Sequence, residues 1–536
     1  MSTRPDRPDT DRPDTERPDT ERPDTDRRSG PSRLRARDPL VLVVGAVSVV
    51  VYVLHGFHGV LTRDLGIYSY AGQQVADGVP PYLGVLNRAG PLAHVLPGVG
   101  VLVARAGGLD ELVTMRVVFM LMAVAAVCLS YLLGRDLFRS RAAGLVTAGA
   151  MLAFHGFINY ASNGPREKTP MALFVIGALW AVTHRRWFTA GVLTSLATLC
   201  LQTAFFSTFA AVVVAVLLLA HGERLRSLVK VAVGGSVPVL VLGVWFALAG
   251  SLRATYDGFY GINRRYTVPN PLTPDRELVW EDLQNAYGVS VWLLLAGPVL
   301  LVLVSLAAAS RRARAAQPGL VVLPAMTAGL AAGLWWILQE YDAWADLFPL
   351  LPFSALGLGA AYAVAARRLA PRWQVVSAGV LVGAAVVIAL TYAVTSREDS
   401  LDDQREATKE VLAMLPEGAT ITSIEAPQPL VLTGRTNPTR YQMFRSGLQD
   451  YMEDTWPGGL VGFQEDLVAD GQDVIAVGET VSRRWRASLQ PEYVYVGSAP
   501  LWDWYARASL GEETIADLRA AAGFDPDDPL AEPLVP

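Results

Sequence analysis

The segment 62–92, TRDLGIYSYAGQQVADGVPPYLGVLNRAGPL, follows directly on the apolar run 39–61 and decides how the rest of the chain is interpreted. It begins with Arg63 and Asp64, and Arg88 stands near its end. A carboxylate is costly inside hydrocarbon, so an acid at the end of an apolar run is expected at the water interface. The segment is therefore predicted to belong to a loop at one face of a membrane.

The composition excludes an ordinary soluble protein. Of the 536 residues, 52% are hydrophobic and only 18% are charged. Apolar stretches recur that are long enough to cross a hydrocarbon core, which takes about 20 residues. The predicted fold class is an all-α polytopic membrane bundle. Nucleic-acid binding is not expected, because the net charge of −5 is negative and no basic nucleic-acid footprint stands out.

Eleven membrane spans are predicted, at residues 39–61, 113–134, 142–161, 169–184, 188–203, 205–221, 232–252, 289–310, 319–338, 348–366 and 374–395. Short basic connections such as 184–186 and 367–372 then fall on one side, which the positive-inside rule assigns to the cytoplasm. Counting 91–107 as a further span would move every later basic connection outside. That run is expected to be a juxtamembrane or partly inserted helix within a long outer loop, 62–112.

The two ends of the chain differ from the bundle. Residues 1–38 are expected to be a disordered cytoplasmic tail, because 4–28 repeat Arg-Pro-Asp-Thr-Asp/Glu and contain nothing apolar to bury. Residues 39–396 form the predicted membrane module, with a second outer loop at 253–288. An odd number of spans places 397–536 outside the cell. The chain is thus predicted to be a multi-pass protein of the plasma membrane.

The region 397–536 is acidic and is expected to fold separately as a small extracytoplasmic α/β domain. Helical spacing is seen at its start and near its end, and short strands are predicted at 419–424, 430–432, 473–477 and 493–496. Its aromatic residues either stack on sugar rings or pack inside the protein. They are Trp456, Trp485, Trp502, Trp504 and Tyr505.

Asp64 has two interpretations on the residues alone. It is either an interfacial acid paired with Arg63, or a general base that deprotonates an acceptor hydroxyl as the hydroxyl attacks an anomeric carbon.

The first outer loop resembles a known family. The order of one apolar span, Asp64, Tyr68, Gly78-Val-Pro-Pro-Tyr82 and Asn87-Arg-Ala-Gly-Pro-Leu92 is similar to the first outer loop of the GT-C glycosyltransferase superfamily, in its dolichyl- or polyprenyl-phosphate-sugar mannosyltransferase-like branch. The runs 115–138 and 346–352 resemble later patterns of that family. The resemblance covers about residues 39–396.

The resemblance implies that Asp64 is the catalytic acid/base residue and that the donor is a polyprenyl-phosphate sugar. Arg88 stands where the family usually has Lys, and either cation is suited to hold the donor phosphate. Ala89-Gly90-Pro91 departs from the family's double proline.

Further candidates lie in segments predicted to face the same side as Asp64. Glu167 is either a second acid that orients the acceptor or part of an ordinary polar turn, and its neighbour Lys168 is a candidate for the phosphate. In the loop 253–288, Arg264 and Arg265 bind either the donor phosphate or lipid headgroups. The tyrosines predicted to line the substrate site are Tyr68, Tyr82, Tyr260 and Tyr341.

The predicted function is an inverting membrane glycosyltransferase, hexosyl- or pentosyl-, that acts at the outer face. Its partners would be a polyprenyl-phosphate sugar donor, a glycan, lipid or protein acceptor of the cell envelope, and membrane lipids. A flippase or other transporter of lipid-linked sugars, and a non-enzymatic envelope scaffold, are the alternatives. The sequence shows no metal-binding motif. No cofactor is predicted, and the question of a divalent metal stays open.

Overall fold

The computed structural model describes residues 38–267, 276–308, 310, 318–445 and 447–531. The predicted repeat tail, the middle of the loop 253–288 and the basic connection that follows residue 310 lie outside these residues.

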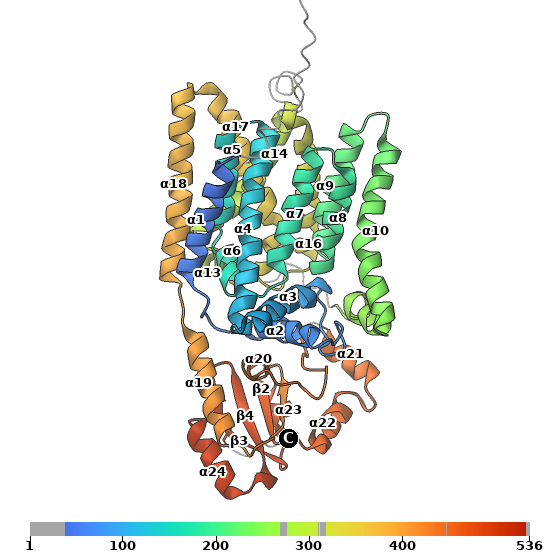
Figure 1. The fold of residues 1–536 in the computed structure, drawn as a ribbon, viewed down its shortest axis with the longest axis vertical. Helices are drawn as coiled ribbons and strands as arrows, with labels where there is room; N and C mark the ends of the chain where they lie inside the picture. The colour runs from blue at the N-terminus through green and yellow to red at the C-terminus, as the bar shows by residue number, and fades with distance from the viewer. Residues whose placement is uncertain (1–37, 268–275, 309, 311–317, 446, 532–536) are drawn as a thin grey trace, which may run out of the picture. The chain divides into compact units, whose positions relative to one another are not determined.

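The central part of the chain is a bundle of helices that run side by side (Figure 1). Its members are α1 (Leu40–His55), α4 (Glu111–Phe138), α5 (Arg141–Ala153), α6 (His155–Ser162), α7 (Lys168–Thr183), α8 (Trp187–Cys200), α9 (Ala204–Leu219), α10 (Arg224–Leu248), α14 (Val291–Ala307), α16 (Leu323–Gln339), α17 (Leu351–Ala365) and α18 (Pro371–Thr395). Every predicted span overlaps at least one of these helices.

The described residues contain six helices that are long and apolar enough to cross a membrane, or seven if the bent pair α5 and α6 counts as one span. Shorter apolar helices of 10–17 residues include α1, α7, α8 and α9. The chain is therefore a multi-pass membrane protein, and the count of eleven crossings stays a prediction.

The predicted span 142–161 is not one straight helix. Its two pieces, α5 and α6, meet at an angle of 69°. Phe154, between them, has extended backbone angles, φ −70° and ψ 111°, which stop the first helix and let the second begin. The bend shortens this segment along the bundle.

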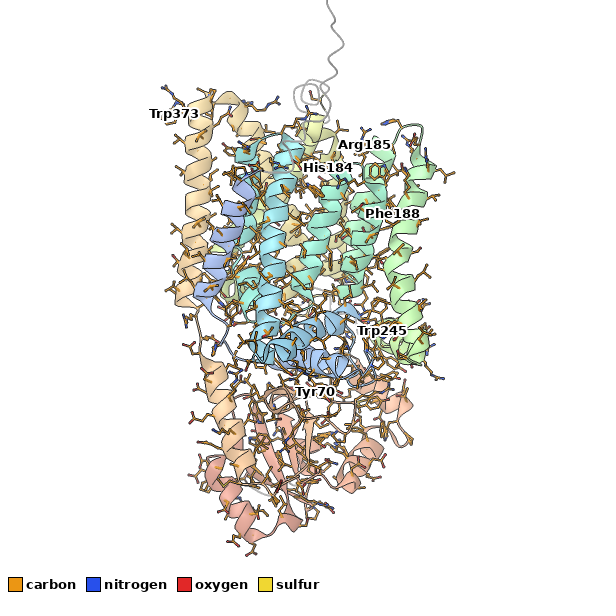
Figure 2. The ribbon with its side chains drawn as sticks, in the orientation of Figure 1. Tyr70, His184, Arg185, Phe188, Trp245 and Trp373 are labelled. Atoms are coloured by element: carbon orange, nitrogen blue, oxygen red, sulfur yellow. The ribbon has the colours of Figure 1, made fainter. Side chains whose placement is uncertain are left out.

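The basic connections gather at one end of the bundle. His184, Arg185 and Trp373 lie at that end, whereas Tyr70 lies toward the other (Figure 2). This agrees with the predicted division of the connections into two sets on opposite faces. Which face meets the cytoplasm stays a prediction.

Close packing of α14 on α17 depends on glycine. A Cβ added to Gly357 would lie 2.0 Å from the carbonyl oxygen of Gly297, and one added to Gly297 would lie 2.3 Å from that of Ser354. The two backbones therefore touch, as they do where small residues line an interface between membrane helices.

Two helices, α2 (Arg63–Ala76) and α3 (Leu92–Gly107), lie across the end of the bundle instead of along it (Figure 1). α2 begins after Thr62, whose hydroxyl accepts from the Leu65 N–H at 3.4 Å. Asp64 occupies the first turn, where the helix dipole favours a carboxylate. Helix α3 corresponds to the ambiguous run 91–107, and its depth in the membrane stays a prediction.

Short helices fill the connections on either side of the bundle. They are α11 (Leu252–Tyr256), η2 (Asp257–Gly261), α12 (Ile262–Arg265), α13 (Arg276–Tyr287), η3 (Gly288–Ser290), η4 (Pro318–Val322), η5 (Trp344–Leu350) and η6 (Ala366–Arg368). Of these, η2 is a single π-helical turn, a feature often found near functional sites.

The C-terminal region contains a four-stranded sheet of order β1-β2-β4-β3, in which β1 and β2 are parallel and the other pairs antiparallel. The strands are β1 (Ile421–Ile424), β2 (Val474–Gly478), β3 (Tyr493–Ala499) and β4 (Trp502–Arg507). The helices are α19 (Ser400–Ala413), α20 (Gln428–Thr433), α21 (Leu448–Thr455), α22 (Gly459–Asp470), α23 (Arg483–Ala487), η7 (Ala508–Leu510) and α24 (Glu512–Ala521). The small sheet confirms the α/β character of the region.

Two details of the sheet differ from the prediction. Residues 430–432 are helical, within α20, because Pro429 stands in the first turn of that helix. Strand β4 was not predicted, and three of the five aromatic residues proposed as sugar-stacking candidates belong to it. Trp502, Trp504 and Tyr505 are fully buried, so they pack inside the protein and cannot stack on a sugar at the surface.

One hydrophobic cluster joins this region to the first loop. It contains Leu61 and Tyr70 together with Val474 and Trp504. Residues 41–536 accordingly group as one unit. Whether the C-terminal region also folds separately stays a prediction.

Gly357→Ala is predicted to destabilise the bundle by about 1–3 kcal/mol, since an added methyl group forces two touching backbones apart. Gly379→Ala, on the neighbouring helix α18, is the matched control, because nothing lies within 4 Å of the added Cβ. The measurement is the thermal unfolding midpoint, Tm, of each variant purified in detergent. Equal Tm values for the two variants would contradict the described packing of α14 on α17.

Candidate active site

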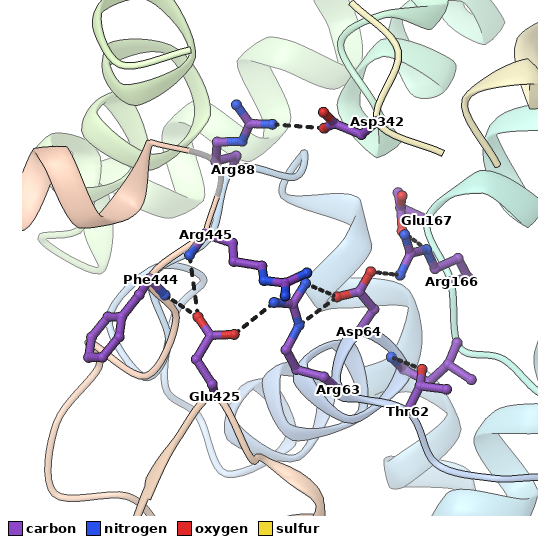
Figure 3. Close-up of polar contacts among 11 residues, drawn as sticks. Thr62, Arg63, Asp64, Arg88, Arg166, Glu167, Asp342, Glu425, Phe444 and Arg445 are labelled. Carbon is purple, nitrogen blue, oxygen red and sulfur yellow. Dashed lines mark hydrogen bonds and ion pairs between the residues drawn. The ribbon is translucent and has the colours of Figure 1, made fainter. Parts of the chain in front are cut away.

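Asp64 is the centre of a network of ion pairs at the start of α2 (Figure 3). Its Oδ1 accepts two hydrogen bonds from Arg63, from Nε at 3.0 Å and from Nη2 at 2.8 Å. Its Oδ2 accepts from Nη1 of Arg166 at 2.6 Å. The carboxylate is thus held between two guanidinium groups that come from different segments of the chain.

The two arginines control the charge of this carboxyl. Burial opposes its ionisation, but the positive charges of Arg166 and Arg63 outweigh burial and hold the pKa of Asp64 well below its usual range. Asp64 is therefore ionised at neutral pH. A base with so low a pKa accepts a proton poorly, so base catalysis requires that a guanidinium first turn away from it.

Arg166 stands in the short connection between α6 and α7. Its guanidinium lies 5.6 Å from the ring centre of Tyr68 and 5.3 Å from that of Tyr160, and it forms an ion pair of 3.2 Å with Glu167. Burial and the nearby Glu167 carboxylate raise the pKa of Tyr68, so its hydroxyl stays protonated. The structure therefore brings together three of the predicted residues, Asp64, Glu167 and Tyr68, around an arginine.

Arg116 holds the backbone segments that precede Arg166 and α2. It is fully buried in α4. Its Nε donates to the carbonyl of Gly164 at 3.1 Å, and its Nη1 donates to those of Phe57 and Gly59 at 2.5 and 3.0 Å. These carbonyls belong to the segments that lead into Arg166 and into α2, so one side chain joins both.

Arg88 occupies a rigid loop, but its guanidinium is only loosely paired. Its carbonyl oxygen accepts from Gln202 at 2.8 Å and from Asn263 at 3.0 Å. Its side chain donates to Thr267 at 3.1 Å. The carboxylates near it are at the limit of ion-pair distance, 3.9 Å for Glu340 and 4.0 Å for Asp342 (Figure 3). Such a guanidinium suits a phosphate that approaches from solvent.

The side chain of Lys168 forms an ion pair within the protein. Its ammonium group is buried and donates to Oδ1 of Asp346 at 2.8 Å. The other oxygen of Asp346 accepts the N–H groups of Asp342 and Ala343. This pair joins the start of α7 to η5, and it leaves Lys168 poorly placed for the predicted contact with a phosphate.

The predicted arginines of the second loop lie beside the Arg88 loop. Both Arg264 and Arg265 are exposed, and Arg264 donates to the hydroxyl of the half-exposed Tyr260 at 2.8 Å. They follow Asn263, which holds the Arg88 carbonyl. Their role as phosphate ligands stays a prediction.

Two of the predicted substrate-lining tyrosines are buried and make hydrogen bonds within the protein. Tyr82 is fully buried, and its hydroxyl donates to the carbonyl of Ala89 at 2.7 Å. The π-helical turn η2 packs on it, since a Cβ at Gly258 would lie 2.4 Å from the Tyr82 ring. Tyr341 is buried, and its hydroxyl donates to Asp282 at 2.9 Å. Both hydroxyls are thus engaged within the protein, and the role of these tyrosines at a substrate site stays a prediction.

Glu425 is the member of the network that sequence reasoning missed. It follows β1, is only 2% exposed, and its Oε2 accepts from Nη1 of Arg63 at 2.7 Å. An acid after a short strand is too common a pattern to single out. Among the described residues, no group of three or more His, Cys, Asp or Glu side chains is arranged to hold a metal ion.

No family model and no curated protein sequence matches the chain. Solved structures do. Apo ArnT from Cupriavidus metallidurans is similar with a TM-score of 0.60 at 14% identity, over 91% of this chain and 99% of ArnT. ArnT bound to undecaprenyl phosphate is similar with a TM-score of 0.62 at 13% identity, over 88% of this chain and 99% of ArnT. The apo oligosaccharyltransferase of Archaeoglobus fulgidus is similar with a TM-score of 0.52 at 13% identity, over 90% of this chain and 77% of the oligosaccharyltransferase chain.

These proteins support the GT-C fold that the first loop suggested. At such low identity the likeness establishes the fold, and the activity has to be argued from the residues of the site.

Arg116→Met is predicted to destabilise the protein by about 2 kcal/mol or more, because three carbonyls lose charge-assisted hydrogen bonds, two of them buried. Arg253→Met is the control, since that side chain is 96% exposed and its ion pair with Asp257 is long, at 3.9 Å. Thermal unfolding of both purified variants measures the difference. A Tm for Arg116→Met within a degree of the control would show that the clamp contributes nothing.

Proposed function

We propose that this GT-C-fold membrane protein is an inverting glycosyltransferase that moves a hexose or pentose from a polyprenyl phosphate to a hydroxyl of the cell envelope. The observation that carries the proposal is the Asp64 carboxylate, held by Arg63 and Arg166 at the end of the bundle. The solved structure of ArnT bound to undecaprenyl phosphate supports a polyprenyl-phosphate donor.

Donor binding is assigned first to Arg88. Among the described residues, the carboxylates paired with its guanidinium lie no closer than 3.9 Å, so a phosphate can accept its hydrogen bonds in a bidentate manner. The exposed Arg264 and Arg265 add positive charge beside it. As the sugar leaves, the lipid phosphate gains charge, and these cations stabilise it more strongly in the transition state than in the bound donor.

Asp64 is assigned as the general base. The acceptor oxygen attacks the anomeric carbon, the bond from that carbon to the phosphate oxygen breaks, and Asp64 takes the hydroxyl proton. An incoming phosphate competes with Asp64 for the guanidinium groups of Arg63 and Arg166. Their partial withdrawal raises the basicity of Asp64 once the donor is in place. Glu167 keeps Arg166 beside the site while this occurs.

The acceptor is a glycan, lipid or protein hydroxyl. The alternatives, a lipid-linked-sugar transporter and an envelope scaffold, give no transfer product in the assay below, so the same experiment separates them from an enzyme.

Asp64→Asn is predicted to lower sugar transfer by about 100-fold or more, as expected when a general base is removed. The assay follows transfer from radiolabelled polyprenyl-phosphate sugar in membranes that contain equal amounts of each variant. Asp77→Asn is the control, because Asp77 ends the same helix and pairs with Arg105 at 2.6 Å, away from the network. Wild-type transfer by Asp64→Asn would rule out its assignment as the base.

Arg88→Ala is predicted to lower kcat/KM for the donor by about 10- to 100-fold, the effect of losing one or two charge-assisted hydrogen bonds. Arg88→Lys is expected to recover part of the lost kcat/KM, because the ammonium group keeps the positive charge but not the bidentate geometry. Steady-state kinetics with varied donor measure both. Arg105→Ala, which removes an arginine of α3 paired with Asp77 and Glu111, is expected to match the wild type. An unchanged donor KM and kcat in Arg88→Ala would assign the phosphate to other residues.

A further inference from the structure

The carboxylate of Glu425 is buried and has three donors. Nη1 of Arg63 donates to Oε2 at 2.7 Å. The N–H groups of Phe444 and Arg445 donate to Oε1, the second at 3.3 Å. Burial of a carboxylate is costly unless such donors satisfy its oxygens. The site network in α2 is therefore connected directly to the C-terminal region.

The backbone at Glu425 is held in an unfavourable conformation. Its φ is +56°, a left-handed value that residues with a Cβ seldom adopt. Its N–H donates to the carbonyl of Gln442 at 2.7 Å. Beside it, Gly478 leaves room that a side chain would fill, because an added Cβ would lie 2.3 Å from the Glu425 carbonyl oxygen. Glu425 therefore holds its carboxylate in place on a locally strained backbone. Such strain is typical of functional positions.

Arg63 divides its donors between two acids. Nε and Nη2 contact Oδ1 of Asp64, and Nη1 contacts Glu425. If the charge of Glu425 were removed, Asp64 would be the one carboxylate still paired with Arg63 among the described residues. The guanidinium would then pair more strongly with Asp64, and both the basicity and the orientation of that carboxylate would change.

We propose that Glu425 is a positioning residue for Asp64, acting through Arg63, so that the C-terminal region completes the active site. Because it refines the same site, this inference rests on the proposed glycosyltransferase function.

A second ion pair of the region provides the contrast. Arg486 and Asp503 are both buried and hydrogen-bonded to each other within the sheet region. Among the described residues, the side chain of Asp503 accepts hydrogen bonds from Arg486 and Ser498, and neither residue belongs to α2 or to the connection between α6 and α7. Asp503→Asn therefore tests what loss of a buried structural ion pair does by itself.

The experiment compares Glu425→Gln, Arg63→Met, the double variant Arg63→Met/Glu425→Met, and Asp503→Asn, each as the full-length protein purified in detergent. Transfer from radiolabelled polyprenyl-phosphate sugar gives kcat and donor KM per folded protein, and thermal unfolding gives Tm. Wild type and Asp64→Asn are run beside them.

Glu425→Gln is expected to lower kcat by about 10- to 100-fold, as a slightly misplaced catalytic group does, with donor KM changed less than twofold. The double variant is expected to match Arg63→Met alone, because both changes act along one path. Asp503→Asn is expected to lower Tm without changing kcat per folded protein. If Glu425→Gln does not fold, the comparison of the double variant with Arg63→Met decides.

The inference is overturned if Glu425→Gln keeps wild-type kcat, or if the losses of Arg63 and Glu425 multiply in the double variant. It is also overturned if Asp503→Asn lowers kcat as much as Glu425→Gln does. The loss of activity would then follow from any disturbed ion pair in the C-terminal region. In each of these cases the wild type still transfers sugar and Asp64→Asn does not, so the proposed function stands. An inactive wild type would instead refute the proposed function, and this inference with it.

Discussion

The described site depends on the pairing of one carboxylate with two arginines. Asp64 meets Arg63 from its own helix and Arg166 from the connection between α6 and α7, at 2.8 and 2.6 Å. A charge removed from water needs such partners, and each partner needs its own support. Arg116 supports the two backbone segments, and Glu425 supports Arg63. The first loop, the bundle and the C-terminal region are therefore tied together by the requirement to keep this carboxylate charged.

Much of the bundle could be predicted, because the signal for an apolar helix lies within about 20 consecutive residues. The bend at Phe154 could not, since no proline stands there and an isolated glycine such as Gly156 is tolerated within a helix. Strand β4 was missed for a related reason. Residues 502–506 are all buried, and the run WDWYA lacks a sustained alternation of apolar and polar residues, which marks a strand with one face in water.

The site was predictable where its residues are local in the sequence. Asp64 and Arg88 share one loop, and Glu167 lies in a short connection predicted to face the same side. Glu425 is 362 positions from Arg63, and only the folded chain brings the two together. Tyr82 shows a contact that the sequence could not indicate. An aromatic residue in a loop looks available for a ligand, but Tyr82 is the core around which the loop folds, because its hydroxyl closes the turn onto Ala89.

The charge state of the network bears directly on the proposed reaction. A carboxylate whose pKa lies well below its usual range is a weak base, and this argues against Asp64 as a permanently active catalyst. The same arginines that lower its pKa are the groups that a phosphate attracts most strongly. In the proposed reaction, the base therefore becomes effective only when an anionic donor competes for Arg63 and Arg166. Such coupling would protect the lipid-linked sugar from loss to water, because the proton acceptor is weak whenever its guanidinium partners remain in place.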